Sequence, residues 1–147
     1  MSMKIPHDCW IVVGDGRKAL LMRNEGDEVY PNFQVERLME QENPPTHEQG
    51  TDEPGRYRAG GDAPRSAFET TDWHDLEEHR FAETVADRLD SLHAKGRFAK
   101  LVVVAPSAVL GTLRKAMSNS LSAAVISEVD KDYTNHPVSE IERLLTT

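Results

Sequence analysis

The sequence predicts an α/β domain whose elements follow in the order βββ, long loop, αβαβα. Two apolar runs flank an Asp-Gly pair near the N-terminus, a helical apolar stripe begins after residue 75, and strand-like and helical segments alternate from there onward. A strand-helix-strand alternation after a meander implies a mixed sheet with helices packed on it. A chain of 147 residues fits one domain, residues 1–147.

The first three predicted strands form an antiparallel meander. Apolar runs at 9–14 and 17–23 flank Asp15 and Gly16, a pair that supplies the positive φ angles of a tight hairpin. A second turn follows at 24–28, and "FQVERLME" at 33–40 alternates as a strand would. The single cysteine, Cys9, lies beside a valine-rich run and is predicted to be buried and unreactive.

Residues 41–73 show no sustained period and hold half of the chain's eight prolines. A structureless segment of this length in a compact domain is functional or disordered. Its second half contains the stretch "GRYRAGGDAPRSAFE", residues 55–69, which we call the arginine segment. Three arginines and a Gly-Gly pair occur there in an otherwise acidic chain.

A long helix is predicted next. Asp75 with Glu78 resembles a capping box, and Lys95 with Gly96 is a typical helix stop. Between these signals, four apolar residues fall at spacings of four, four and three, which places them on one face of a helix. They are Phe81, Val85, Leu89 and Leu92.

The C-terminal third predicts a strand, a helix, a strand and a short helix. "KLVVVAP" is a buried strand, and Ser107 is predicted to cap the helix that follows it. "AAVISEVDKD" is the next strand, and Pro137 lies in the first turn of the last helix. The residues predicted to face inward from these two helices are Val109, Leu110, Leu113, Met117, Val138, Ile141, Leu144 and Leu145.

Composition limits the classes of function. The net charge of −8 opposes general attraction to phosphate backbones, although it is compatible with a local basic patch. The N-terminus lacks the pattern of a signal peptide, and no stretch approaches the roughly 18 apolar residues of a membrane span. No phosphate-binding loop or dinucleotide fingerprint is present, so we expect a cytoplasmic protein without a cofactor or a metal and without a membrane partner.

One candidate ligand site follows the predicted strands. "EVDKDYTNHP" at 128–137 follows the last strand, and Asp15 ends the first strand. The carboxyl ends of strands are favoured ligand sites in α/β sheets. The candidate residues are Asp15, Asp130, Lys131, Asp132 and His136. The alternatives are a hairpin role for Asp15 and a capped loop before Pro137.

Several segments together resemble one family, the bacterial host-attachment proteins. They are "WIVVGDGRKALLMRN", "GRYRAGGDAPRSAFE", "DLEEHRFAETVADRL", "LVVVAPSAVLGTLRKAM" and "EVDKDYTNHPVSEIERLL". That family is similar to the middle domain of archaeal and eukaryotic class 1 peptide release factors, a ribonuclease-H-like domain. In release factors a Gly-Gly-Gln loop follows the third strand, and Gly60-Gly61-Asp62 occupies the comparable place here.

The resemblance implies a non-enzymatic domain that binds RNA or the ribosome. Asp62 replaces the glutamine, and an ionised Asp only accepts hydrogen bonds, so no catalytic residue is predicted. The predicted contact residues are Arg56, Arg58, Gly60, Gly61, Asp62 and Arg65. A protein-interaction module acting in host-cell attachment is the first alternative. A metal-dependent nuclease using Asp15 is the second, and it needs several convergent carboxylates.

Overall fold

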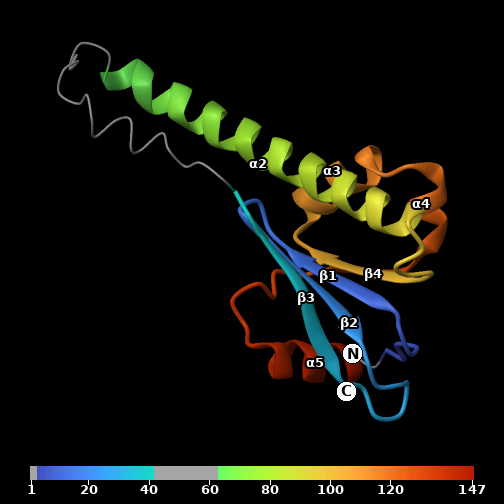
Figure 1. The fold of residues 1–147 in the computed structure, drawn as a ribbon. Coiled ribbons are helices and arrows are strands. Elements are labelled where there is room, and N and C mark those ends of the chain that lie inside the picture. Colours follow the sequence, from blue (N-terminus) through green and yellow to red (C-terminus); the bar gives the residue numbers. More distant parts are fainter. Residues whose placement is uncertain (1–2, 42–62) are drawn as a thin grey trace.

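A computed structural model of the chain describes residues 3–41 and 63–147, with side chains from residue 75 onward in the second range. Figure 1 shows the path of the chain. Its elements are β1 (Trp10–Gly14), β2 (Lys18–Asn24), β3 (Phe33–Glu40), α2 (Ala63–Ala94), β4 (Leu101–Ala105), α3 (Ser107–Ala116), α4 (Asn119–Ala124), β5 (Val125–Asp130) and α5 (Val138–Thr146). The α/β class and the antiparallel meander are therefore confirmed.

The five strands form one mixed sheet in the order β3-β2-β1-β4-β5. The meander is antiparallel, whereas β1, β4 and β5 run parallel to one another. At the centre of the sheet, Val12 lies opposite both Leu21 and Val103. The carboxyl ends of β1, β4 and β5 therefore meet at one edge of the sheet.

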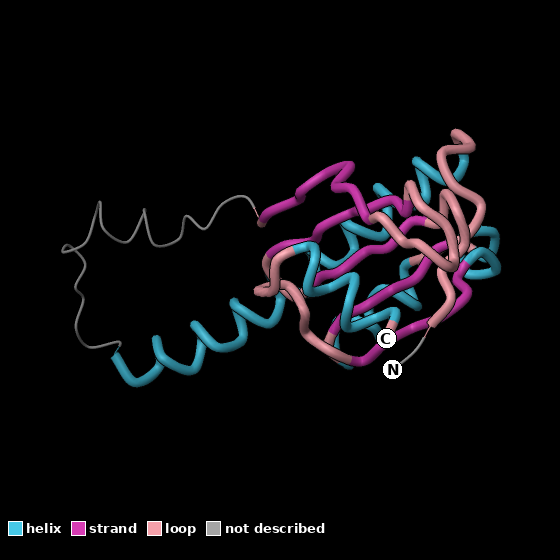
Figure 2. The backbone as a smooth tube through the Cα atoms, turned by 90° about the horizontal axis from the view of Figure 1, so that it is seen from below, coloured by secondary structure: helices cyan, strands magenta, loops and turns pink. Residues whose placement is uncertain are grey.

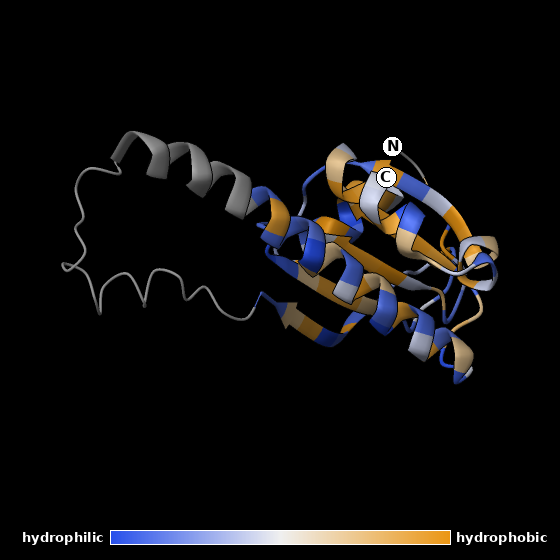
Figure 3. Cartoon of the chain, turned by 90° about the horizontal axis from the view of Figure 1, so that it is seen from above, coloured by the Kyte–Doolittle hydropathy of each residue, from blue (hydrophilic) through white to orange (hydrophobic). Residues whose placement is uncertain are grey.

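Helices cover both faces of the sheet (Figures 1 and 2). Alternation along β1 divides its side chains, because successive residues of a strand point to opposite faces. Trp10 and Val12 pack in a cluster with α2, α3 and α4, while Ile11 and Val13 pack in a second cluster with α5. Figure 3 shows hydrophobic colouring on the strands between these layers.

Cys9 belongs to the cluster beneath α5 and is 1% exposed. Burial raises the pKa of its thiol from 9.0 to about 12, because the interior disfavours the thiolate. The prediction of a buried cysteine is confirmed, and the thiol stays protonated at neutral pH.

The long helix begins earlier than predicted. α2 starts at Ala63 and not at the Asp75 capping box, so residues 63–73 of the predicted loop are helical. The first part of α2 projects beyond the sheet in Figure 1. Helical turns that project beyond the sheet need no apolar stripe, so the hydrophobic periodicity of the sequence did not predict a helix there. The predicted end is confirmed, since α2 stops at Ala94 and Gly96 has a φ of 77°.

The predicted cap of α3 was wrong. The N-cap of α3 is Pro106, and Ser107 is the first helical residue without a side-chain cap. A short helix that was not predicted, α4, is capped by Ser118, whose side chain accepts a hydrogen bond from the Leu121 N–H at 3.0 Å. The predicted inward-facing residues agree better with the structure, because Leu110 and Leu113 of α3 and Ile141 of α5 are buried.

Within the described residues, no helix is both long and apolar enough to cross a membrane.

Candidate binding site at the carboxyl edge of the sheet

The turn between β1 and β2 lies at the carboxyl edge of the sheet, and the Asp15 side chain holds it. Asp15 Oδ1 accepts hydrogen bonds from the backbone N–H of Arg17 at 2.7 Å and of Lys18 at 2.8 Å. The Asp15 N–H donates to the Lys18 carbonyl at 2.9 Å. The hairpin is confirmed, but its explanation changes, because neither Asp15 nor Gly16 has a positive φ.

Gly16 is required for space. A Cβ atom at this position would lie 2.6 Å from two side-chain carbons of Glu78 on α2. Real Cβ atoms do not approach carbon so closely, and a larger residue would therefore displace Glu78. The turn is thus packed directly against the long helix.

Thr134 connects this turn to the segment after β5. Its side chain is buried, with the residue 7% exposed. Its hydroxyl oxygen lies 2.9 Å from Asp15 Oδ2 and 2.6 Å from Asp132 Oδ1, and its backbone N–H donates to Asp132 at 3.1 Å. A hydroxyl has one hydrogen, so it donates to one of the two carboxylates at a time. Asp15 and Asp132 therefore converge on one buried hydroxyl.

The other candidate residues are arranged separately. Lys131 is exposed, and the His136 ring packs edge-on against Tyr133 at 5.6 Å. Asp130 lies near Arg114. The hydrogen bond to Glu128 raises the pKa of Arg114, and the negative charge of Asp130 raises it further. Among the five predicted ligand residues, side-chain hydrogen bonds join Asp15 and Asp132, through Thr134, a residue that the sequence did not single out.

Asp15 and Asp132 are the two carboxylates that meet at this position. No three His, Cys, Asp or Glu residues in 3–41 and 75–147 lie close enough to hold a metal ion. One oxygen of Asp15 is also engaged by the turn. The arrangement supports the hairpin and loop roles that were the alternatives for these residues.

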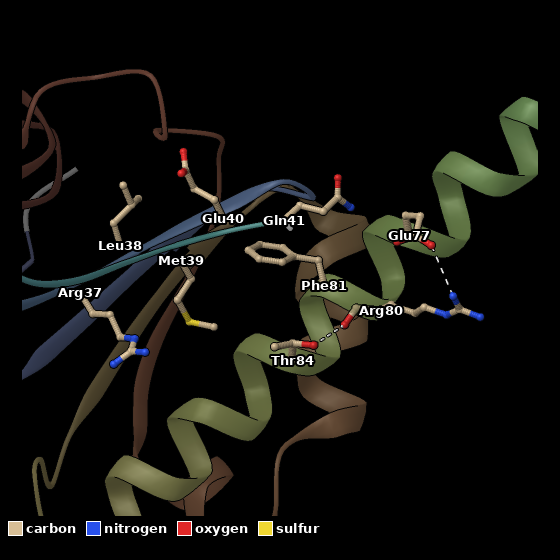
Figure 4. Close-up of a pocket in the computed structure, with 9 residues that line it drawn as sticks. All are labelled: Arg37, Leu38, Met39, Glu40, Gln41, Glu77, Arg80, Phe81 and Thr84. Carbon is tan, nitrogen blue, oxygen red and sulfur yellow. Dashed lines mark hydrogen bonds and ion pairs between the residues drawn. The ribbon is translucent and has the colours of Figure 1, made fainter. Parts of the chain in front are cut away.

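A groove lies between β3 and α2, at the end where β3 stops. Its volume is 340 Å³, and Figure 4 shows its lining. Met39 from β3 and Phe81 from α2 point into the space between the two elements, whereas Leu38 and Glu40 point away from α2. The lining residues are Arg37, Leu38, Met39, Glu40, Gln41, Glu77, Arg80, Phe81 and Thr84.

The groove has an apolar floor and a polar rim. Phe81 is buried and Met39 is partly buried against the same cluster. On the rim, Arg80 pairs with Glu77 at 3.3 Å across one helical turn, an exposed contact that contributes little to stability. The Gln41 N–H donates to the Arg17 carbonyl at 2.8 Å, which joins the groove to the first hairpin.

The sequence alone gives no sign of this groove. The residues that line it come from two distant segments of the sequence, the end of the third strand and the start of the apolar stripe of α2. Each half had an ordinary explanation as a strand or a helix face. Only the pairing of β3 at the edge of the sheet brings the two halves together.

The predicted arginine contact residues lie mostly outside the described residues. These are Arg56, Arg58, Gly60, Gly61 and Asp62. Arg65 belongs to the first turns of α2, and its side chain is likewise outside the description. The described ends of the intervening segment are Gln41, beside the groove, and Ala63, at the start of α2.

A comparison with known families decides the identity of this domain. The sequence model of a family described as "Protein required for attachment to host cells" matches residues 10–145. The chain belongs to this host-attachment family. The match runs from β1 to α5, so it includes the turn at Asp15, Thr134 and the groove.

A curated relative also resembles this host-attachment protein. An uncharacterised protein of Rickettsia prowazekii (strain Madrid E) is 29% identical over 83 residues, which cover 54% of this chain and 55% of the relative. The chain therefore spans about half the length of the curated relative that it matches.

Proposed function

We propose that this host-attachment protein is a binding domain without enzymatic activity, which contacts RNA through the arginine segment. The RNA is ribosomal or otherwise structured. Arginine suits this role because its planar fork bonds phosphate oxygens and its plane stacks on exposed bases. The proposed contact residues are Arg56, Arg58, Gly60, Gly61, Asp62 and Arg65.

One observation carries this proposal, namely the place of the arginine segment in the chain. It follows β3 and leads into α2. Release-factor middle domains carry their Gly-Gly-Gln loop at the same place. The sheet order, with an antiparallel meander continued by parallel strands, also supports our finer proposal that the fold is ribonuclease-H-like and similar to that middle domain.

Peptide release is not part of the proposal. Asp62 stands where release factors have glutamine, and a carboxylate cannot donate the hydrogen bonds of an amide. Negative charge at position 62 would also be repelled by rRNA phosphate. The proposed activity is therefore binding, and we propose that this binding underlies the contribution of the protein to host-cell attachment.

The described surface around Gln41, where the chain leaves β3, does not supply the attraction by itself. Arg17 and Arg37 lie at this end of the sheet, but Glu40 and Glu77 lie there too. With a net charge of −8 for the chain, attraction to a polyanion has to come from the arginines of the segment. RNA binding is therefore expected to depend steeply on these few side chains.

Co-sedimentation with ribosomes over a salt series tests the proposal. We expect the wild-type chain to bind and the Arg56→Ala/Arg58→Ala variant to bind weakly. The dependence of log affinity on log salt should lose a slope of about 2, because about one unit is lost for each phosphate contact removed. Binding that is identical for the two proteins would refute RNA contact through these arginines.

A matched control separates this local effect from a change of net charge. Lys95 and Arg97 are exposed just after α2, at the amino end of β4 and thus at the opposite edge of the sheet. The Lys95→Ala/Arg97→Ala variant removes the same two charges and is expected to bind as the wild type does. An equal loss in both variants would indicate a non-specific charge effect.

The groove favours a second candidate function, which is protein interaction in host-cell attachment. A concave site with the buried Phe81 as its floor and charges at its rim fits a protein or peptide segment. A pull-down with and without RNase distinguishes the two functions. Partners that survive RNase and are lost on Thr84→Trp, which fills the groove, would favour this second function.

A further inference from the structure

β3 is an edge strand, and one side of its backbone faces no other strand of the described chain. The strand is eight residues long, and five consecutive residues from Gln34 to Leu38 are exposed. An edge of this length is a template for pairing with a further strand.

A β-bulge places two apolar side chains on the same face of β3. The register shifts between Leu21 and Met22, so that Val35 lies opposite Met22 and Leu38 lies opposite Leu20. Leu20 and Met22 are two residues apart on β2, so Val35 and Leu38 share a face although they are three residues apart. They are 48% and 53% exposed, on the face that carries α5.

The backbone groups of Val35 and Leu38 point away from β2. Asn24 directs its own N–H and C=O toward the β1 side. Its cross-strand partner Phe33 directs its N–H outward, and this N–H donates to the Glu142 carboxylate at 3.0 Å. Hydrogen-bonded and non-hydrogen-bonded pairs alternate along antiparallel strands. The pairs of Val35 with Met22 and of Leu38 with Leu20 are therefore non-hydrogen-bonded, as is the pair of Phe33 with Asn24, and the N–H and C=O of Val35 and Leu38 point outward.

We propose that two copies of this chain associate through β3 in antiparallel orientation, joining their sheets across a two-fold axis. In the register centred between Glu36 and Arg37, Val35 of one copy lies opposite Leu38 of the second copy. These two residues exchange backbone hydrogen bonds, and their side chains meet on the face of α5. The two-fold axis repeats the contact, so that four half-exposed apolar side chains become buried.

Charge favours the same register, because it brings Glu36 opposite Arg37 of the second copy. Within one chain, Arg23 pairs with Glu36 at 3.1 Å, with Asp8 at 2.9 Å and with Glu25 at 2.7 Å. Three carboxylates around one guanidinium leave a local charge of about −2, which attracts a further cation. Many edge strands carry charges that repel a second copy, whereas Glu36 and Arg37 are complementary in this register.

Analytical ultracentrifugation of the full chain over a concentration series tests the pairing. We expect a reversible dimer. Arg37→Glu should raise its dissociation constant about tenfold or more, because two attractive pairs become repulsive at once. Lys95→Glu makes the same change of net charge at a distant exposed site and should leave the constant unchanged.

A second matched pair tests the apolar contact. Leu38 on the β3 edge and Ile126 on the β5 edge are 53% and 44% exposed. Leu38→Asp should dissociate the dimer, and Ile126→Asp should not. Far-UV circular dichroism checks that each variant is folded, which is expected because both side chains are already half in water.

Cross-linking tests the register. Opposite residues of a hydrogen-bonded pair have Cα atoms about 5.5 Å apart, within the range of a disulfide. A mixture of the Val35→Cys and Leu38→Cys chains should form a mixed disulfide dimer on oxidation, and either chain alone should form far less. The native thiol of Cys9 is buried and does not interfere.

Four results would overturn the proposal. The first is a monomer at every concentration, and the second is a dimer that the β3 and control variants affect equally. The third is a monomer that captures a foreign protein and loses it on Leu38→Asp, which would replace the second copy by another partner. A dimer that breaks on Ile126→Asp would transfer the interface to β5.

Discussion

At the scale of the residue, the most informative side chain is Thr134. It is a buried hydroxyl between two carboxylates that are more than one hundred positions apart in the chain. Hydrogen bonds to charged groups contribute more than neutral ones. Loss of the hydroxyl removes the hydrogen bond to Asp15, whereas Asp132 keeps the backbone N–H of Thr134. Thr134 therefore fastens the first hairpin to the segment that precedes α5.

Thr134→Val tests this link because it keeps the shape of the side chain and removes the hydroxyl. We expect the free energy of unfolding to fall by about 1–3 kcal/mol. Urea denaturation monitored by circular dichroism measures the change. Thr134→Ser keeps the hydroxyl and should retain more of the stability than valine does. Valine and wild type of equal stability would show that the link contributes nothing.

At the scale of the element, two glycines at helix positions have opposite roles. Gly96 follows α2 with a φ of 77°, in the left-handed region that ends many helices. Gly111 lies inside α3, and a Cβ atom there would meet nothing within 4 Å. The same residue type is thus required by the backbone in one place and costs helix stability in the other.

Alanine substitutions separate these roles. Gly96→Ala should destabilise the protein by about 1 kcal/mol, because alanine is strained at positive φ. Gly111→Ala should stabilise it by about 0.5–1 kcal/mol, because alanine is the better helix former. Thermal or urea unfolding measures both. Changes of the same sign in the two variants would contradict this account of the helix end.

At the scale of the whole molecule, two apolar clusters share one sheet. Leu89 of α2 lies in the first cluster and Ile141 of α5 in the second, both fully buried. β1 and β4 contribute alternate residues to both clusters. Because β1 and β4 belong to both clusters, unfolding of one cluster would expose the other, so the domain is expected to unfold as one unit.

Leu89→Ala and Ile141→Ala test this coupling from opposite faces of the sheet. Each should lower the free energy of unfolding by about 2–5 kcal/mol, because each leaves a cavity in a packed core. Urea unfolding should remain a single transition in both variants, with the same midpoint by circular dichroism and by fluorescence. Leu76→Ala, on the exposed side of α2, is the matched control and should change little. Two separate transitions would show that the faces are independent.

The candidate sites differ in how far the sequence could predict them. The hairpin role of Asp15 could be predicted because an Asp-Gly pair between apolar runs is a local pattern, and this role is confirmed. The link through Thr134 and the groove could not be predicted from the sequence, since each depends on residues far apart in the chain. The contact role of Arg56 and its neighbours stays a prediction.

By itself the sequence determined the α/β class, the meander and the inward faces of the helices, because apolar periodicity and turn residues are local properties. It also sufficed for the resemblance to the host-attachment family, which the family comparison confirms. Only the tertiary structure decided where α2 begins, because its first turns project beyond the core and carry no apolar stripe. It also decided the strand order, which leaves β3 at an edge and sets its register and bulge. These features depend on contacts between distant residues, which no local pattern records.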